Sequence, residues 1–300
     1  MTDPSGAAEP ARPRRSVLYM PGANERALQK ARGLAADALI LDLEDAVAPE
    51  AKQAARERVS AAVGGYGRRE VVIRVNARDT PWHADDVRAA AAAGPDAVLV
   101  PKVGGPADVR TVAADLVAAG APEHTRVWAM VETPSAVLHA EEIAHSDERL
   151  AVLVMGTNDL VNELRARHVP GRAPLLPSLA LCLLAARAGG LAILDGVYND
   201  VRDAEGFEAE CRVGRDMGFD GKTLVHPGQI EPCNRAYAPT EAELAAAREV
   251  LEAWEAARAA GIGVLTVGGR MVENLHVDNA RRLLAANEAI QALAADVPRS

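Results

Sequence analysis

Two carboxylates stand directly after two apolar runs in the middle of the chain. Glu132 follows one run in AMVETPSA (residues 129–136), and Asp159 follows another in VLVMGTNDL (residues 152–160). Carboxylates without Cys or His at ligand spacing favour a hard cation, Mg²⁺ or Mn²⁺, which keeps waters or takes substrate oxygens. Zinc would want sulfur or imidazole, and the sequence has no CxxC or HxxxH spacing to supply them. We therefore expect Glu132 and Asp159 to bind one Mg²⁺, the alternative being two solvated acids at strand ends.

Other chemically active side chains follow similar apolar runs. Arg74 could hold a substrate carboxylate at two points, or it could form an ion pair with Asp42 or Glu44. His226 in VHPGQ could act as a base, but a histidine before a proline turn is more often a structural hydrogen-bonding group. The other charged residues after such runs are Glu44, Asp45, Lys102 and Asp195. Acids and bases that meet at the carboxyl ends of parallel strands indicate an active site.

Eight short apolar runs alternate with longer amphipathic, Ala-rich stretches. The runs cover residues 16–20, 38–43, 70–75, 96–101, 126–131, 150–155, 191–196 and 221–226. Their nearly continuous apolar character is typical of strands that are buried on both faces. Eight β-then-α units predict an α/β fold, a (β/α)₈ TIM barrel over residues 14–237. A doubly wound open sheet is disfavoured, because the first turn, MPGANERA, lacks the GxGxxG fingerprint.

Both ends of the chain lie outside this alternation. Residues 1–13 are expected to form a mobile tail. Residues 238–300 are expected to form a C-terminal helical extension, which packs on the barrel or on a neighbouring subunit. Within it, Thr240 and Glu243 have capping-box spacing at the start of a helix over residues 240–261. A hairpin around Gly268-Gly269 and a last helix over residues 277–295 should follow.

Composition limits the classes of partner. Lys and Arg total 33 against 42 Asp and Glu, a formal net charge of −9 that argues against nucleic-acid binding. The three cysteines have no CxxC spacing, which indicates a reducing compartment. No apolar stretch approaches the roughly 20 residues that span a membrane, and the first residues do not read as a targeting segment. We therefore expect a cytoplasmic protein that acts on small molecules.

Seven ordered motifs resemble the citrate lyase β-subunit-like family of the HpcH/HpaI aldolase superfamily, which includes malyl-CoA and citramalyl-CoA lyases. The motifs are RRSVLYMPGANERALQKA, LDLEDAVAPEAKQAAR, VIRVN, AMVETPSA, GTNDL, ILDGVYNDVRDAEGF and GFDGKTLVHPGQIEPCN. They cover residues 14–237 in the family's order, with a partial match through residue 285. The resemblance implies a barrel enzyme that uses Mg²⁺, and seven motifs in order are far more specific than any one of them.

The resemblance also assigns roles to residues of this chain. It implies that Glu132 and Asp159 hold Mg²⁺ and that Arg74 binds the carboxylate of a keto acid. The acidic segment with Asp42, Glu44 and Asp45 would line the metal site behind these ligands. For the phosphates of coenzyme A, charge alone suggests Arg14, Arg15 and Lys102.

One motif departs from the family pattern. Many relatives carry an Asp in a C-terminal segment that reaches a neighbouring subunit's site as an acid–base group. Here the segment reads GRMVENLHV, so Glu273 replaces that Asp and Leu275 stands where Pro is common. The extra methylene moves the carboxylate by about 1.5 Å, and proton transfer is sensitive to such a displacement. Glu273 is therefore a candidate acid–base residue.

The implied activity is Mg²⁺-dependent cleavage or formation of a carbon–carbon bond in a 3-hydroxy-carboxyacyl-CoA such as malyl-, citramalyl- or citryl-CoA. Arg74, Glu273 and Asp45 are the candidate catalytic residues. One alternative is a malyl-CoA thioesterase or malate-synthase-like activity on the same scaffold. Others are an aldolase for CoA-free keto acids and a non-catalytic acyl-CoA-binding protein. The family expectation is a homo-oligomer, a trimer or a dimer of trimers.

Overall fold

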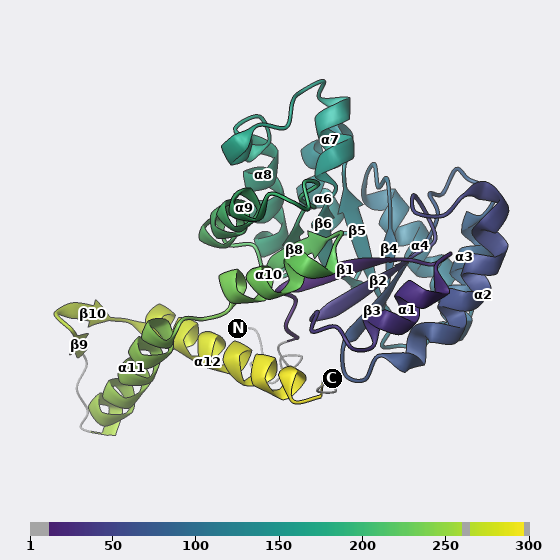
Figure 1. Ribbon diagram of the computed structural model, residues 1–300. Helices are drawn as coiled ribbons and strands as arrows, with labels where there is room; N and C mark the ends of the chain where they lie inside the picture. The colour runs from purple at the N-terminus through teal and green to yellow at the C-terminus, as the bar shows by residue number, and fades with distance from the viewer. Residues whose placement is uncertain (1–11, 260–264, 297–300) are drawn as a thin grey trace. The chain divides into compact units, whose positions relative to one another are not determined.

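A computed structural model describes residues 12–259 and 265–296 (Figure 1). The chain separates into two compact units, Arg14–Tyr237 and Ala238–Asp296, which are described one at a time. The mobile tail expected over residues 1–13 lies, apart from its last two residues, outside the described part. None of the helices in the described ranges combines the length and the apolar character that crossing a membrane requires.

The first unit is a closed barrel of eight parallel strands in sequence order, in which the last strand pairs with the first. The strands are β1 Ser16–Pro21, β2 Ala38–Asp42, β3 Glu70–Arg74, β4 Ala97–Val100, β5 Arg126–Val131, β6 Leu150–Met155, β7 Ala192–Asp195 and β8 Gly221–Leu224. Each coincides with a predicted run to within two residues at either end. The predicted (β/α)₈ TIM barrel is therefore confirmed.

Helices connect consecutive strands and surround the barrel (Figure 1). The α-helices are α1 Glu25–Ala31, α2 Lys52–Ala62, α3 His83–Ala93, α4 Pro106–Ala118, α5 Pro134–Leu138, α6 Ala140–Ala144, α7 Thr157–Glu163, α8 Leu176–Ala188, α9 Ala204–Met217 and α10 Ile230–Tyr237. Short 3₁₀ turns are η1 Pro49–Ala51, η2 Val63–Gly65, η3 Pro170–Arg172 and η4 Pro227–Gln229. Local signals set several boundaries; Asn24, for example, caps α1 by accepting the Ala27 N–H at 3.1 Å.

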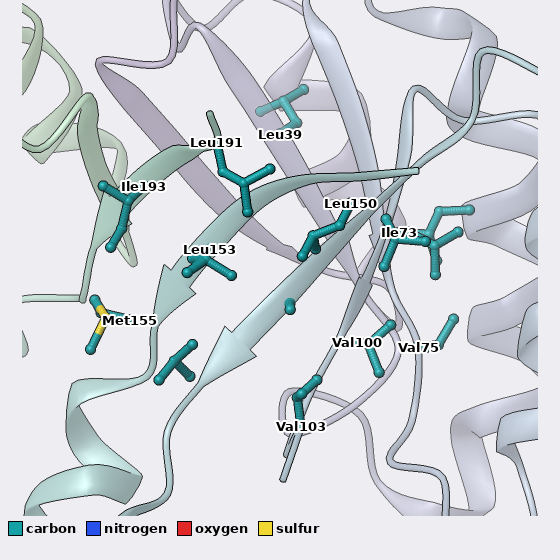
Figure 2. Close-up of a cluster of buried hydrophobic side chains, with 14 of the residues drawn as sticks. Leu39, Ile73, Val75, Val100, Val103, Leu150, Leu153, Met155, Leu191 and Ile193 are labelled. Carbon is teal, nitrogen blue, oxygen red and sulfur yellow. The ribbon is translucent and has the colours of Figure 1, made fainter. Parts of the chain in front are cut away.

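The strands bury both faces in two separate apolar clusters. The outward cluster packs against the helices, and Figure 2 shows part of it, including Leu39, Ile73, Leu153 and Ile193. The inward cluster fills the barrel and comprises strand residues such as Ile40 and Trp128. Full burial of one such aliphatic side chain contributes about 1.5–3 kcal/mol. Successive residues of a strand point alternately into these two clusters. The same alternation therefore fixes whether the side chain at the carboxyl end of each strand points into the barrel or outward.

The C-terminal unit contains a helix pair and a hairpin. Its elements are α11 Glu241–Ala259, β9 Leu265–Val267, β10 Arg270–Val272 and α12 Asn274–Ala294. The hairpin turns at Gly268 and Gly269, whose φ values of 55° and 77° suit the tight turn that favours glycine. The predicted helical extension and its hairpin are confirmed; the last two residues of the helix expected over 240–261 lie outside the described ranges.

Candidate active site

Strand alternation brings three functional side chains to the mouth of the barrel. On β2, β3 and β5 the inward residues at the upper end of the apolar filling are Ile40, Val72 and Met130. Two positions further along the chain, on the same face, come Asp42, Arg74 and Glu132. All three are buried, with exposed fractions of 1%, 7% and 2%. The fold therefore places one base and two acids at the carboxyl ends of three strands.

Arg74 is held by a carboxylate in a two-point ion pair. Its Nε and Nη2 donate to the two oxygens of Asp42 at 2.6 and 2.7 Å, and its guanidinium stacks 4.8 Å from the Tyr19 ring centroid. Nη1 lies 3.0 Å from Glu44 Oε2 and 3.3 Å from Asp45 Oδ2. Although burial lowers the pKa of Arg74, Asp42 raises it well above its usual value. The ion pair that the sequence offered as an alternative is therefore present, and Nη1 is the nitrogen that does not contact Asp42.

Lys102 joins the ends of β2 and β5. Its backbone N–H donates to Glu132 Oε1 at 2.6 Å, from a residue in the left-handed conformation with φ of 52°. Its side chain is half-exposed, and its Nζ lies 3.9 Å from Glu44 Oε1. Burial, followed by Asp45 and Asp42, raises the pKa of Glu44 to about 7. Glu44 therefore lies between two cations, Arg74 and Lys102.

Glu132 and Asp159, which the sequence predicts as a cation-binding pair, are close enough for their carboxyl groups to interact. Burial first, and then the neighbouring carboxyl groups of Glu44 and Asp159, raise the pKa of Glu132 to about 8. Asp159 stands in the first turn of α7, directly after β6. A Cβ at Gly156 would lie 2.6 Å from Glu132 Oε2, so only glycine allows the backbone to approach this carboxylate. Two acids pressed together in a buried site are a poor arrangement without a cation between them.

The donor set fits Mg²⁺. Two carboxylates are the protein ligands that a hexacoordinate Mg²⁺ usually has, with waters and substrate oxygens completing its shell. Within residues 12–259 and 265–296, no three or more His, Cys, Asp or Glu side chains gather in a way that would enclose a metal ion. A cation held by this pair would therefore keep positions open for water and substrate, unlike one in the closed sulfur and imidazole sets of structural zinc.

Arg15 is not brought to this site. It precedes β1, so it lies at the amino-terminal ends of the strands, where its guanidinium donates to both oxygens of Asp37 at 2.8 Å. Arg14 lies at the same end, paired with Glu70 at 2.6 Å. Charge alone could not distinguish the two ends of the barrel. Both arginines close the end opposite the acids, and this placement argues against their expected part in binding the phosphates of coenzyme A.

Three further residues singled out from the sequence have other surroundings within their own units. Asp195 points outward from β7 and pairs with Lys222 at 3.0 Å and Arg172 at 2.6 Å. His226 caps η4 by accepting the Gly228 N–H at 3.0 Å, the structural role that the sequence favoured. Glu273 belongs to the C-terminal unit, where it precedes α12. Its acid–base role remains a prediction.

Two residues of the site were missed from the sequence. The Tyr19 ring supports Arg74, and Met130 Sδ lies 3.9 Å from both the Tyr19 hydroxyl and Arg74 Nη1. Burial raises the pKa of Tyr19, and the nearby carboxylates add to this. The alternation of side chains along a strand could have identified Tyr19, because it lies two positions after the inward Val17 and therefore on the same face.

Comparison with known proteins places the chain among relatives of matching length. The family model for HpcH/HpaI aldolase/citrate lyase matches residues 15–227. A protein of Cereibacter sphaeroides named (3S)-malyl-CoA thioesterase is 52% identical over 290 residues, covering 96% of this chain and 99% of its own. The citrate lyase subunit beta of Escherichia coli is 38% identical over 284 residues, covering 92% of this chain and 94% of its own.

Solved structures of proteins from the same family are also similar to this chain. CitE of Mycobacterium tuberculosis in complex with magnesium, acetoacetate and coenzyme A is 32% identical, with a TM-score of 0.73. The match covers 91% of this chain and 97% of that one. A citrate lyase beta subunit from M. tuberculosis with oxaloacetate and magnesium is 33% identical, with a TM-score of 0.66 over 76% of this chain and 98% of that one. As the motifs predict, the chain belongs to the HpcH/HpaI aldolase/citrate lyase family and is an enzyme.

Proposed function

We propose that this enzyme hydrolyses the thioester of a 3-hydroxy-carboxyacyl-CoA of the malyl-CoA type and depends on Mg²⁺. The observation that carries the proposal is one unbroken chain of polar contacts across five strand ends. It runs from Asp42 through Arg74, Glu44, Lys102 and Glu132 to Asp159. Arg74, near one end of this chain, suits a substrate carboxylate. Glu132 and Asp159, at the other end, suit a hard cation. The 52% identity to a named (3S)-malyl-CoA thioesterase supports hydrolysis as the outcome.

Glu132 and Asp159 would hold the cation. When bound, Mg²⁺ supplies positive charge that polarises substrate oxygens and stabilises the negative charge that develops on them. The magnesium in the related solved structures supports this assignment.

Arg74 and Lys102 would bind and orient the substrate. Arg74 Nη1 presents its N–H groups to the substrate carboxylate in place of Asp45, while Asp42 keeps the guanidinium plane in position. The Lys102 side chain, which is 53% exposed, offers a cation to the thioester end of the molecule. Such fixed geometry lowers the entropic cost of bringing the reacting atoms together.

The hydrolytic step needs one carboxylate as a base. Water adds its oxygen to the thioester carbonyl carbon and gives a proton to that base, for which Asp45 and Glu273 are the candidates. The carbon–sulfur bond then breaks, and the CoA sulfur takes the proton as it leaves. The products are the free hydroxy acid and the CoA thiol.

Carbon–carbon cleavage is the second candidate, supported by the 38% identity to a citrate lyase subunit beta. Here a base removes the proton of the 3-hydroxyl, the bond between the α and β carbons breaks, and a keto acid forms. The remaining acyl-CoA leaves as an enolate and takes a proton at carbon. The same residues would bind the substrate in both reactions.

A homo-oligomer is proposed as well, a trimer by family expectation, in which Glu273 would act at a neighbouring subunit's site. Light scattering of the purified protein tests the oligomer directly. An activity assay of mixed subunits tests Glu273. A Glu273→Gln variant should be inactive alone. Mixing it with an Arg74→Lys variant should restore activity, because a site with Arg74 from one subunit and Glu273 from its neighbour is then complete.

Product analysis decides between the two reactions. Purified protein and Mg²⁺ are incubated separately with malyl-, citramalyl-, methylmalyl- and citryl-CoA, and the products are identified by mass spectrometry beside a Glu132→Ala control. Free CoA with the intact hydroxy acid, lost in the control, supports the thioesterase. A keto acid with a shorter acyl-CoA supports the lyase instead. No turnover of any of the four contradicts both.

A further inference from the structure

A buried lysine outside the predicted site makes three hydrogen bonds beneath the acidic segment 42–45. Lys52 begins α2 and is 6% exposed. Its Nζ donates to the Leu43 carbonyl at 2.8 Å, the Glu44 carbonyl at 2.7 Å and Asn76 Oδ1 at 2.6 Å. An ammonium group has three N–H donors, so all of them are used. The Trp82 ring covers the group, with its centroid 5.2 Å from Nζ.

These three acceptors belong to the segments that follow β2 and β3, the two strands that present Asp42 and Arg74. The Leu43 and Glu44 carbonyls are in the segment that carries the site acids. The same segment folds on itself, because Asp42 accepts the N–H groups of Glu44 at 2.9 Å and Ala46 at 3.1 Å. Lys52 therefore binds the backbone carbonyls of a short loop whose acidic side chains face Arg74.

The third acceptor is itself fixed from α3. Asn76 donates its side-chain amide to Asp86 at 2.6 Å and its backbone N–H to the same oxygen at 3.0 Å. Arg56 donates to the other Asp86 oxygen at 2.7 Å. Because the Asn76 amide nitrogen is committed to Asp86, its oxygen must face Lys52. A buried polar chain thus connects helices α2 and α3 to the loop after β2.

We propose that Lys52 is a positioning residue for the reaction, which holds the 42–45 backbone so that Glu44 stays against Arg74 Nη1 and Asp45 stays beside the substrate that displaces it there. It touches no reacting atom and acts through the carbonyls of Leu43 and Glu44. Without the ammonium, the Leu43 carbonyl and Asn76 Oδ1 lose the donor that Lys52 supplies, and the Glu44 carbonyl keeps only the Val47 N–H at 3.0 Å. The loop is then free to move away from Arg74. This inference rests on the proposed function only for its kinetic consequence, since the hydrogen bonds themselves do not depend on the substrate.

A second buried lysine provides a matched control. Lys222 is fully buried and pairs with Asp195 and Glu210 on the outward side of the barrel, away from the mouth. Lys52→Met and Lys222→Met each keep an unbranched side chain as far as the ε position and remove one buried ammonium. Both should lower the melting temperature. Only Lys52→Met should change the kinetics of the folded protein.

The kinetic test measures kcat and KM for the thioester that the wild type hydrolyses or cleaves. Lys52→Met should lower kcat by about 30-fold or more with KM within about 3-fold, since misplacement by about 1 Å can cost a factor of about 100. Lys222→Met should keep kcat within about 2-fold. An equal fall in kcat for both variants would mean a purely structural role and overturn the inference. If Lys52→Met does not fold, Asn76→Ala, which removes one acceptor, should lower kcat in the same direction by less.

Hydrogen exchange tests the same contact without any substrate. In Lys52→Met, amide exchange in a peptide covering residues 43–48 should rise by about 10-fold or more, while a peptide covering β7 should stay as in the wild type. Lys222→Met should show the reverse. A wild type that turns over no thioester would refute the proposed function and leave this test intact. Unchanged exchange over residues 43–48 would refute the positioning role whatever the activity.

Discussion

The Lys102 backbone N–H donates to Glu132 Oε1 at 2.6 Å while the residue itself is in the left-handed conformation. For a residue with a Cβ this conformation costs roughly 1–2 kcal/mol, and glycine adopts it freely. The backbone geometry orients the carboxylate that we assign to the cation. A lysine therefore stands where glycine would orient Glu132 equally well, which indicates that the ammonium beside Glu44 has a function of its own.

Replacement of Lys102 by glycine should separate stability from activity. Lys102→Gly keeps the N–H donor and relieves the strain, so the free energy of unfolding should be equal to the wild type or up to about 1 kcal/mol higher. It removes the ammonium, so kcat/KM should fall by about 10–100-fold. Chemical denaturation and steady-state kinetics check the two effects. Full activity of Lys102→Gly would show that the ammonium takes no part in substrate binding.

The Glu132–Asp159 pair should behave as a cation site whose acids destabilise the metal-free protein. Glu132→Gln should weaken Mg²⁺ binding by about 100-fold or more, because a charged ligand is lost. Without Mg²⁺ the same variant should be as stable as the wild type or more so, since glutamine removes the free-energy cost of burying this acid beside Asp159. Calorimetric titration and thermal unfolding measure both quantities. Glu142→Gln on the exposed face of α6 is the matched control and should change neither.

Mg²⁺ binding should strengthen as pH rises. The pKa of Glu132 is raised from 4.5 to about 8, so the stability that its protonated form provides is present below 4.5 and is lost as pH rises through 8. The cation must displace this proton to bind. The affinity for Mg²⁺ should therefore increase by up to about 10-fold per pH unit between pH 6 and 8. Titrations at pH 6, 7 and 8 measure the slope, and Glu132→Gln should lose it. Affinity independent of pH in the wild type would contradict the raised pKa.

Arg74 should not be replaceable by lysine. Asp42 uses both of its oxygens on the Arg74 fork, and one ammonium cannot match that geometry. Arg74→Lys should lower kcat/KM by about 100-fold or more and destabilise the fold by about 3 kcal/mol, the order expected for a broken buried ion pair. Kinetics and urea unfolding provide the readouts. Arg78→Lys, at a partly exposed arginine that pairs with Asp108, is the control and should change the stability by less than about 1 kcal/mol.

Much of the site was predictable because the family motifs and strand ends are local features of the chain. Glu132, Asp159, Arg74, Glu44 and Asp45 come together as expected. Charge alone did not show that Arg15 lies away from these residues. Its position before a strand already places it at the other end of a parallel barrel. Lys52 gave no local signal, since its acceptors Leu43 and Glu44 are backbone carbonyls whose direction only the folded loop defines.

Two nearly identical runs show that the sequence does not determine which face of a strand points into the barrel. ALILDL at residues 38–43 and LAILDG at residues 191–196 both end an apolar strand with ILD. In β2, Ile40 points into the barrel and Asp42 follows it to the mouth; in β7, Ile193 points outward and Asp195 joins Lys222 beneath the helices. The sequence by itself determined the eight strands, their order and the acids at their ends. Which face each strand turns inward was decided only by the closed barrel, because strands that are apolar on both faces carry no sign of their register.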